Sequence, residues 1–531
     1  MSNEAILPTN ISTAHAVINQ LTLKNQELLW RIQDLQQQVD WFRRQIFGEK
    51  SEKKNIPFAD LGLLEQLWLG GEAPQEQAAL IDPSTTIKEH TRKRVGKEAL
   101  EDDCGESGLR FDSTVPVEEI ACPPSEIEGL SPDQYEVIDT KYTERLCQRQ
   151  GSYYIKRYVR PVVKIKESQT IVALPAPEAV LGRSYSDVTL LAGIAVDKFM
   201  YHLPLFRQHQ RIERAGIMIA RGNLTSWLHK AAHLLKPIYN AVLVSVLNSQ
   251  VLAMDETSLK AGIEKKGKLH RGYVWVLYGD KDEAAFMYSP TRALNAIEPY
   301  VKNFCGTLIT DGYTVYELLA AKYGGILHAL CWAHTRREFF EGQAYEPVLC
   351  HKALAYIGKL YAEEAKIRKL EFTGEKKLLY RVEHERDVVD QFFEWLKVEV
   401  KNNSLLPSNR FLKAANYALK REDGLRLYLA NPDVPIDTNH IEREIRPIPL
   451  GRKNWMFCWS EVGAEVVAIF ETLISSCKLQ GVNPFEYLVD VLQSIEIHPM
   501  SRVSELTPRE WAARKNKKKA IQAIDVADAL E

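Results

Sequence analysis

Apolar residues recur at alternating spacings of three and four near the start of the chain. The positions are Ile18, Leu21, Leu28, Ile32, Leu35, Val39, Phe42 and Ile46, with the polar Asn25 at one further seam position. A heptad pattern sustained in this way predicts a coiled coil over residues 14–47. Isoleucine or valine at one seam position and leucine at the other favours a parallel homodimer. The same pattern also fits a long amphipathic helix packed on its own chain.

Short apolar runs alternate with amphipathic stretches between residues 250 and 335. The runs predict strands at 251–254, 272–279, 284–289, 307–310 and 325–330, and helices at 294–303 and 315–322. This order is typical of an α/β fold. Asp255 ends the first strand and Asp311 follows the fourth. If these two strands are neighbours, both carboxylates lie at one edge and repel each other unless a divalent cation sits between them.

A third acidic segment follows about 120 residues later, where residues 437–447 predict a short helix. Asp437 or Thr438 can cap its start, and Pro447 limits its end. The helix carries two candidate acids, Glu442 and Glu444. These lie two residues apart and therefore on different helix faces.

Other periodicities divide the rest of the chain. Residues 136–172 alternate as β-strands and are rich in Lys and Arg, and residues 187–235 read as helical. Residues 212–219 and 223–232 predict a helix-turn-helix with its turn at Gly216, which would offer Thr225 and Lys230 to DNA. For residues 136–172, the alternative to a DNA-binding role is an ordinary sheet with a solvated face. For the helix-turn-helix, the alternative is a helix pair packed in the core. From about 341 to 435 the pattern is helical, and residues 55–135 favour a linker.

Composition limits the possible functions. The formal net charge is −2 and the pI is about 6.7, so any nucleic-acid contact must come from local clusters. Eight cysteines without a Cys-x-x-Cys pair fit a reducing compartment. Neither a signal pattern nor an apolar run long enough to cross a membrane is visible. We therefore expect a cytoplasmic protein without membrane contact.

Several long motifs resemble the TnpC-type transposases of the insertion sequence 66 family. They are AMDET (253–257), TDGYTVY (310–316), CWAHTRREFF (331–340), NHIEREIRPIPLGRKNWMF (439–457) and GVNPFEYLVDVL (481–492). The resemblance covers about residues 150–495. It implies a DDE transposase with a ribonuclease-H-like mixed sheet and a helical insertion, an N-terminal zipper and a helical/β DNA-binding region.

This resemblance implies the site. Asp255, Asp311 and Glu442 would hold two Mg2+ or Mn2+ ions, which suit oxygen-only ligands. Water would cut the DNA strand, and the freed 3′-OH would attack target DNA without a covalent enzyme intermediate. Glu442 matches the family's Asn-x-x-Glu-Arg pattern, with Glu444 as the alternative. Glu256 is expected to point to the opposite side of the strand from Asp255.

The motifs also suggest contacts around the acids. Arg443, Arg446, Arg452 and Lys453 would bind DNA phosphates, although each alone could form a surface salt bridge. Cys331 and His334 form half of a zinc site, for which we expect a structural role near the acids. Many family members carry a zinc module with paired cysteines. Here the corresponding cysteines stand alone, so we expect no zinc there; they are Cys104, Cys122 and Cys147.

The predicted organisation has five parts. They are a coiled-coil segment with a basic end (1–55), a linker or weakly ordered region (56–135), a DNA-binding region (136–245), a catalytic domain (246–475, insertion 341–435) and a C-terminal tail (476–531). Expected partners are the element's DNA ends, target DNA, a second copy of the chain and small accessory proteins of the same element. The alternatives are a metal-dependent nuclease that does not join DNA, and a catalytically inactive, sequence-specific DNA-binding protein.

Overall fold

The computed structural model describes residues 110–111, 113–149, 151–182, 184–265, 268–402, 405–406 and 408–517. The chain divides into two compact units, Met1–Leu100 and Glu101–Glu531, and every described residue belongs to the second. The predicted coiled coil and the basic end of that segment therefore lie outside the described residues. No helix in the described ranges is long and apolar enough to cross a membrane.

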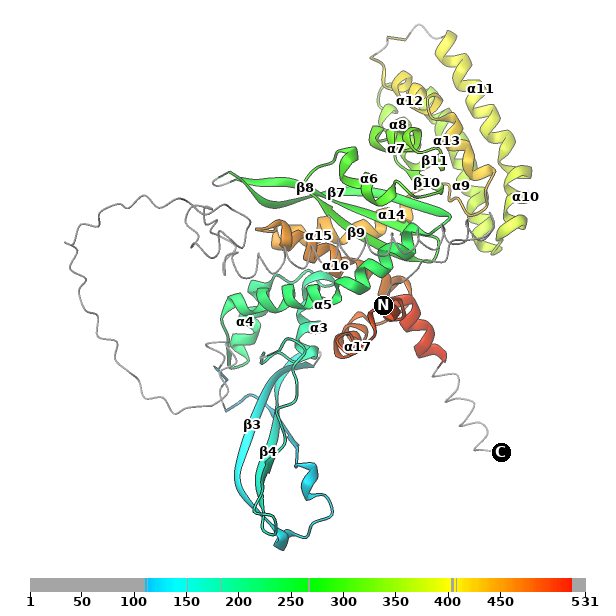
Figure 1. Ribbon diagram of the computed structural model, residues 1–531. Helices are drawn as coiled ribbons and strands as arrows, with labels where there is room; N and C mark the ends of the chain where they lie inside the picture. The colour runs from blue at the N-terminus through cyan, green and yellow to red at the C-terminus, as the bar shows by residue number, and fades with distance from the viewer. Residues whose placement is uncertain are drawn as a thin grey trace, which may run out of the picture. The chain divides into compact units, whose positions relative to one another are not determined.

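A five-stranded mixed sheet forms the centre of the described unit (Figure 1). Its strands are β7 (Val251–Lys265), β8 (Lys268–Gly279), β9 (Glu283–Ser289), β10 (Gly306–Thr310) and β11 (Ile326–Leu330). The order across the sheet is β11-β10-β7-β8-β9. The strand β10 runs parallel to β7 and β11, and β8 runs antiparallel to its two neighbours. The predicted α/β class and the five predicted strands are confirmed.

The first of these strands is longer than predicted. The apolar run stops at Asp255, but β7 continues to Lys265 because β8 pairs with it beyond that point. Asp255 lies opposite Val276, and Leu259 lies opposite Gly272. The expectation that Asp255 ends the strand is therefore wrong. Cross-strand hydrogen bonds maintain a strand whose own sequence has turned polar.

Helices cover the sheet and its free edge. The helix α16 (Glu461–Leu479) lies along β9, where Thr472 Oγ1 accepts a hydrogen bond from Phe286 N at 2.8 Å. Ser476 Oγ donates to the carbonyl of Ala284 at 3.1 Å. These hydroxyls satisfy backbone groups that an edge strand would otherwise expose. The long helix α5 (Arg221–Leu247) packs against both α16 and β9.

The connections between strands are also helical. The helices α6 (Leu294–Val301) and α7 (Thr314–Lys322) join β9 to β10 and β10 to β11. Both were predicted from their apolar periodicity. They provide the crossovers that parallel strands require.

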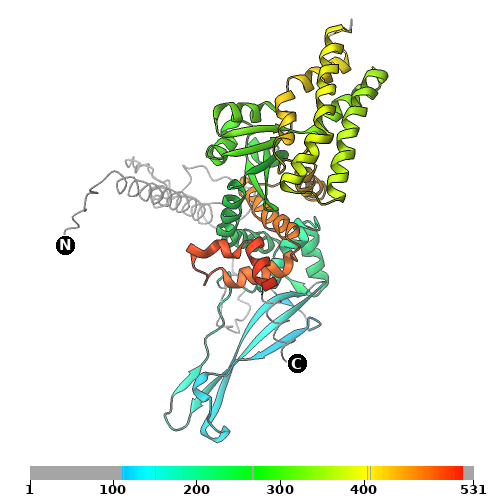
Figure 2. The ribbon, with the colours of Figure 1, turned by 90° about the vertical axis from the view of Figure 1, so that its right-hand side faces the viewer.

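A second sheet lies in the preceding part of the chain. It contains β2 (Val117–Ala121), β3 (Tyr135–Arg149), β4 (Ser152–Ile165) and β5 (Ile171–Ala173). The order is β2-β4-β3, with β5 also paired to β4, and the strands form the blue-to-cyan ribbon in Figure 2. The predicted strands of residues 136–172 are confirmed.

The stretch expected to be a linker also contributes to this sheet. Residues 117–121 form β2, and short 3-10 turns follow at Ser125–Ile127 and Pro132–Gln134. The linker prediction is therefore wrong for the described residues of its last part. The composition is polar, but β4 supplies a partner strand in parallel register, which local sequence does not reveal.

The predicted helix-turn-helix has different boundaries. After α3 (Val188–Phe199), the helix α4 spans Leu205–Arg214, and Ile217–Met218 form β6 instead of continuing a helix. Gly216, with φ of 80°, makes the predicted turn and ends α4 early. The next helix, α5, starts at Arg221, two residues before the predicted start at residue 223.

A helical insertion follows β11, as predicted. It comprises α8 (Trp332–Gly342), α9 (Pro347–Lys369), α10 (Gly374–His384), α11 (Arg386–Asn402), α12 (Arg410–Leu419) and α13 (Glu422–Arg426). The helices α10 and α11 meet at the buried Glu385. Aromatic rings join α8 to the rest of the insertion, for example Phe339 and Phe392, whose centroids lie 6.0 Å apart.

A buried arginine holds the insertion together. On α10, Arg381 is fully buried; its Nε donates to Glu364 Oε1 at 2.6 Å and its Nη1 to the carbonyl of Tyr428 at 2.8 Å. Arg381→Met leaves these acceptors buried without a donor, so we expect a loss of about 3 kcal/mol in the free energy of unfolding. Urea denaturation measures this loss.

Arg368→Met, at an exposed position of α9, is the control and should cost less than about 0.5 kcal/mol. Equal losses in the two variants would contradict the stabilising role of Arg381.

The segment expected to be a C-terminal tail is packed as far as the structure describes it. The helix α17 (Pro484–Ser494) lies against α3, and the 3-10 helix η5 (Met500–Leu506) lies against α5. Tyr487 donates a buried hydrogen bond to the carbonyl of Leu506 at 2.7 Å. Residues 508–517 are helical. The tail prediction is therefore wrong for residues 476–517, whose apolar faces complete the core.

Candidate active site

Two aspartates lie side by side on neighbouring parallel strands. The register of β7 and β10 pairs Val251 with Thr307 and Ala253 with Ile309. Two positions further along, Asp255 and Asp311 reach the same level, on strands about 4.8 Å apart. The prediction that their strands are neighbours is confirmed.

Backbone amides orient both carboxylates. Asp255 Oδ1 accepts a hydrogen bond from Glu256 N at 2.7 Å. Asp311 Oδ1 accepts one from Tyr313 N at 2.9 Å, directly before α7 begins at Thr314. This position places Asp311 near the positive end of the helix dipole.

Glu442 belongs to a short helix that packs over the strand carrying Asp255. The helix α14 spans Asn439–Ile445 and contacts β7 and β8. Thr438 occupies the N-cap position, and Asp437 Oδ1 accepts the hydrogen bond of Asn439 N at 3.1 Å. The next helix, α15, begins at Pro447, as the predicted limit requires.

A contact across the insertion fixes the start of α14. The backbone N and Oγ1 of Thr438 donate to Cys331 Sγ at 3.3 and 3.2 Å. The next residue after Cys331, Trp332, donates its N–H to the carbonyl of Ile436 at 3.1 Å. The end of β11 therefore holds the helix that carries Glu442, although the insertion separates them in sequence.

Negative charge accumulates around Asp255. Burial is the main cause that raises the pKa of this carboxyl from an ordinary 3.8 to about 7. Three neighbouring carboxylates add to burial, namely those of Glu256, Asp311 and Glu442. The three predicted acids are therefore brought together closely enough to act on one another.

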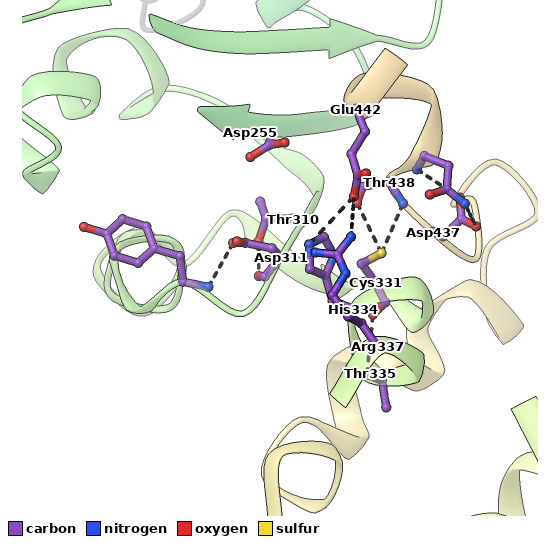
Figure 3. Close-up of polar contacts among 12 residues, drawn as sticks. Asp255, Thr310, Asp311, Cys331, His334, Thr335, Arg337, Asp437, Thr438 and Glu442 are labelled. Carbon is purple, nitrogen blue, oxygen red and sulfur yellow. Dashed lines mark hydrogen bonds and ion pairs between the residues drawn. The ribbon is translucent and has the colours of Figure 1, made fainter. Parts of the chain in front are cut away.

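The two candidate glutamates have different surroundings, and Figure 3 shows those of Glu442. Glu442 Oε1 is buried without a hydrogen bond, and lies 3.7 Å from His334 Nε2 and 4.0 Å from Arg337 Nη2. Glu444 instead accepts a hydrogen bond from Ser475 Oγ on α16. Glu442 therefore points to the cationic side chains of α8, close to the aspartates, and Glu444 is turned to the neighbouring helix.

The chemistry of the donors suits a hard cation. All three groups are carboxylates, and the buried oxygen of Glu442 lacks the partner that a cation would provide. In the arrangement described, however, no three His, Cys, Asp or Glu side chains within the described ranges lie close enough together to hold a metal ion. Glu442 is directed to His334 and Arg337, so its side chain must turn for all three acids to share a cation.

Glu256 is on the other side of the strand from Asp255, as predicted. Its buried carboxylate forms an ion pair with Arg292 and accepts a hydrogen bond from Tyr316. The guanidinium of Arg292 lies over the ring of Tyr313, 3.7 Å from its centroid. This pairing reduces the charge next to Asp255.

Cys331 and His334 have separate roles beside the acids. The Cys331 thiol is buried, which raises its pKa, and it accepts the hydrogen bonds of Thr438. His334 faces Glu442. Sequence reasoning missed Arg337, which also faces Glu442; its place three residues after His334, on the same side of α8, is the signal that could have identified it.

The basic residues near α14 differ in exposure. Arg443 and Arg446 line a pocket together with Lys478. Arg452 donates to the carbonyl and hydroxyl of Ser258 on β7, and Lys453 is exposed. Arg452 therefore has a structural partner, whereas the other three cations of this group can reach a ligand from solvent or from the pocket.

The two DNA-binding candidates on α5 are half-buried. Thr225 and Lys230 lie on a helix whose neighbouring side chains Trp227 and Leu228 are in the core. The helix α5 thus packs in the core along much of its length. Contact of Thr225 or Lys230 with DNA stays a prediction.

Ion pairs use much of the positive charge on the second sheet. The pairs are Arg149–Glu118, Arg157–Glu119, Arg157–Glu144 and Lys156–Asp187. Arg160 is buried and donates to Thr143 Oγ1 at 2.7 Å. These contacts favour the alternative of an ordinary sheet with a solvated face.

The raised pKa of Asp255 predicts a pH-dependent cost to folding. The unfolded chain ionises this group above about pH 4, but the folded chain does so only near pH 7, so the cost develops across that interval. Asp255→Asn has no proton to lose. At pH 8 in EDTA we expect it to be roughly 1–3 kcal/mol more stable than the unsubstituted protein.

Urea denaturation at pH 4.5 and pH 8 measures this difference, which should nearly vanish at the lower pH. The exposed Asp423→Asn is the matched control and should show no such pH dependence. A variant that is less stable at pH 8 than the unsubstituted protein would contradict the burial of a charged Asp255.

Three family models match the chain. The model described as "Transposase IS66 family" matches residues 183–466, and "IS66 C-terminal element" matches residues 472–509. "Transposase C of IS166 homeodomain" matches residues 34–105, which overlaps the predicted coiled coil and much of the expected linker. This match supports DNA binding.

Relatives from Sinorhizobium fredii (strain NBRC 101917 / NGR234) are similar over most of their length. Uncharacterized protein y4hP is 28% identical over 504 residues, covering 90% of this chain and 88% of that protein. Uncharacterized protein y4jD is 28% identical over 382 residues, covering 68% and 73%. Because the first family model spans more than half of the chain and includes all three acids, the chain belongs to the IS66 family of transposases.

Proposed function

We propose that this protein is a DDE transposase that binds the ends of its insertion sequence, cleaves 3′ ends and joins them to target DNA. Asp255, Asp311 and Glu442 would hold two Mg2+ or Mn2+ ions. The observation that carries the proposal is the register of β7 and β10, which brings both aspartates to one level beneath the helix that bears Glu442.

The topology of the sheet supports the same proposal. The first strand, β7, is central, with antiparallel β8 and, beyond it, β9 on one side and parallel β10 and β11 on the other. A mixed sheet is what the resemblance implies for a ribonuclease-H-like fold. The helical insertion between β11 and α14 is also in the implied place.

The bound cations would polarise the scissile phosphate and lower the pKa of the attacking water. The protein's own contribution is to hold three oxygen donors in a largely buried position. Arg292 neutralises the adjacent Glu256. His334 and Arg337 contact Glu442 and can place positive charge near the DNA phosphate. Arg443, Arg446 and Lys453 would then hold flanking phosphates.

A two-stage assay tests the activity. Purified protein with Mg2+ should nick DNA that carries the element's end, and a pre-cut end with a free 3′-OH should yield joined product. Nicking without joining would favour the nuclease alternative. Specific binding without divalent-ion-dependent cleavage would favour the inactive DNA-binding alternative.

The partners follow from the same proposal. A homodimer through residues 14–47 would bring two element ends together, with the element's small accessory proteins completing the assembly. Sedimentation of the full chain should give the mass of a dimer, and a chain that starts after residue 47 should give that of a monomer. A truncated chain that remains dimeric would place the dimer contact elsewhere.

A further inference from the structure

The connection between α15 and α16 contains a strained turn. α15 ends at Trp455, and Met456 has φ of 63° and ψ of −53°. Phe457 N donates to the carbonyl of Trp455 at 2.8 Å, which closes a three-residue γ-turn. This hand of γ-turn is rare and strained for a residue with a side chain.

The turn exposes apolar side chains. Met456 is 64% exposed and Trp459 is 38% exposed. The ring of Phe457 meets that of Trp459 edge to face, with centroids 4.9 Å apart. Backbone strain of this kind clusters at functional and ligand-binding sites, so the turn is a candidate binding feature.

The turn is fixed to the strand that carries Asp255. Cys458 N donates to the carbonyl of Lys260 at 2.9 Å, and Cys458 forms a β-bridge with Ala261. Arg452 reaches Ser258 on the same strand. Figure 1 shows α15 beside the β7–β8 pair.

The position of the turn sets a distance along DNA. Ala261 is six residues beyond Asp255 on β7, which corresponds to about 20 Å at roughly 3.3 Å per residue. Successive stacked nucleotides advance by about 3.4 Å along one strand. The turn therefore lies about six nucleotides from a phosphate bound at Asp255.

Exposed cations lie on the elements that adjoin the turn. Lys453 precedes the turn, and Lys260 and Arg271 lie exposed on β7 and β8. Aromatic and apolar side chains that accept bases, interleaved with cations that accept phosphates, are the combination that binds unpaired nucleic-acid strands. The positive charge of these three side chains complements the phosphates of a DNA strand.

We propose that Lys453, Met456, Phe457, Trp459 and Lys260 form a stacking surface for an unpaired stretch of the DNA strand, about six nucleotides from the scissile phosphate. Trp459 and Met456 stack on bases, and the two lysines contact phosphates. The spacing rests on the proposed function, because it is measured from Asp255. The binding itself does not require cleavage.

The test uses the full chain in EDTA, so that cleavage does not contribute. Fluorescence anisotropy measures binding to a fluorescein-labelled dT oligonucleotide of twelve nucleotides and to a blunt duplex of equal length. Trp459→Ala should weaken binding to the single strand roughly five- to a hundredfold, with little change for the duplex. Tyr345→Ala, which removes a 64%-exposed aromatic ring from the helical insertion, is the matched control and should change neither.

A second variant separates binding from folding. Met456→Gly removes the exposed side chain and tolerates the positive φ, so it should raise the unfolding temperature while weakening binding to the single strand. Unchanged dT binding in both variants would overturn the stacking surface. A loss of dimer mass without loss of dT binding would also overturn it, because the surface would then hold a second copy of the chain.

The outcomes for the two proposals are distinguishable. A protein that binds dT through Trp459 but never cleaves element-end DNA would contradict the transposase proposal alone. A protein that cleaves and joins, with dT binding insensitive to Trp459→Ala, would contradict only the stacking surface.

Discussion

Replacing Asp311 by Asn should reduce Mg2+-dependent nicking of element-end DNA by about a thousandfold or more. A bound metal ion contributes several kcal/mol of transition-state stabilisation, and each 1.36 kcal/mol is a factor of ten in rate. Asn offers a weaker, neutral ligand in place of one of three carboxylates. Single-turnover cleavage with excess protein measures the rate of the chemical step.

The fold should survive this change. Asp311 accepts a hydrogen bond from Tyr313 N, and the Asn carbonyl oxygen can accept the same bond. The urea midpoint and dimer mass should therefore stay unchanged. The exposed Asp423→Asn serves as the matched control and should cleave like the unsubstituted protein. Cleavage retained by Asp311→Asn would remove the basis of the enzyme assignment.

Glu442→Gln should lose as much activity as Asp311→Asn, whereas Glu444→Gln should retain cleavage within about tenfold. Glu442 is one of the carboxylates that raise the pKa of Asp255, and its buried oxygen Oε1 lacks a hydrogen bond. Glu444 is engaged by Ser475, so its substitution should cost about 1 kcal/mol of stability instead. The two variants place the same chemical change two residues apart on one helix, which makes each the control for the other.

Magnesium titration adds a second readout for this pair. If Glu442 is a ligand, Glu442→Gln should require a higher Mg2+ concentration for half-maximal cleavage, and Glu444→Gln should not. The reverse result would assign the third carboxylate to Glu444. It would also require α14 to turn, because Glu444 now faces α16.

These effects reflect a compromise between stability and function. Asp255 is buried beside other carboxylates, which raises its pKa and makes its charged form costly. The site keeps this cost instead of pairing Asp255 with a cationic side chain. Glu256, one residue away, has such a partner in Arg292. An unpaired, largely buried acid next to a paired one is the arrangement expected where a cation from solution supplies the missing charge.

Local sequence signals are sufficient to predict many of the strands and helices. Alternation and apolar runs predict the five strands of the central sheet, and the motifs mark the acids Asp255, Asp311 and Glu442. Such signals succeed because the side-chain period of a strand or helix is set by local backbone geometry. The long sequence motifs are sufficient to identify the family.

The tertiary structure alone decided features that depend on partners distant in sequence. β7 extends past Asp255 because β8 pairs with it, and residues 117–121 form a strand because β4 accepts them. The contact of Thr438 with Cys331, 107 residues away, decides which face of α14 meets the aspartates. A periodic pattern shows which side of an element is buried, but the identity of its neighbour depends on chain closure over long separations.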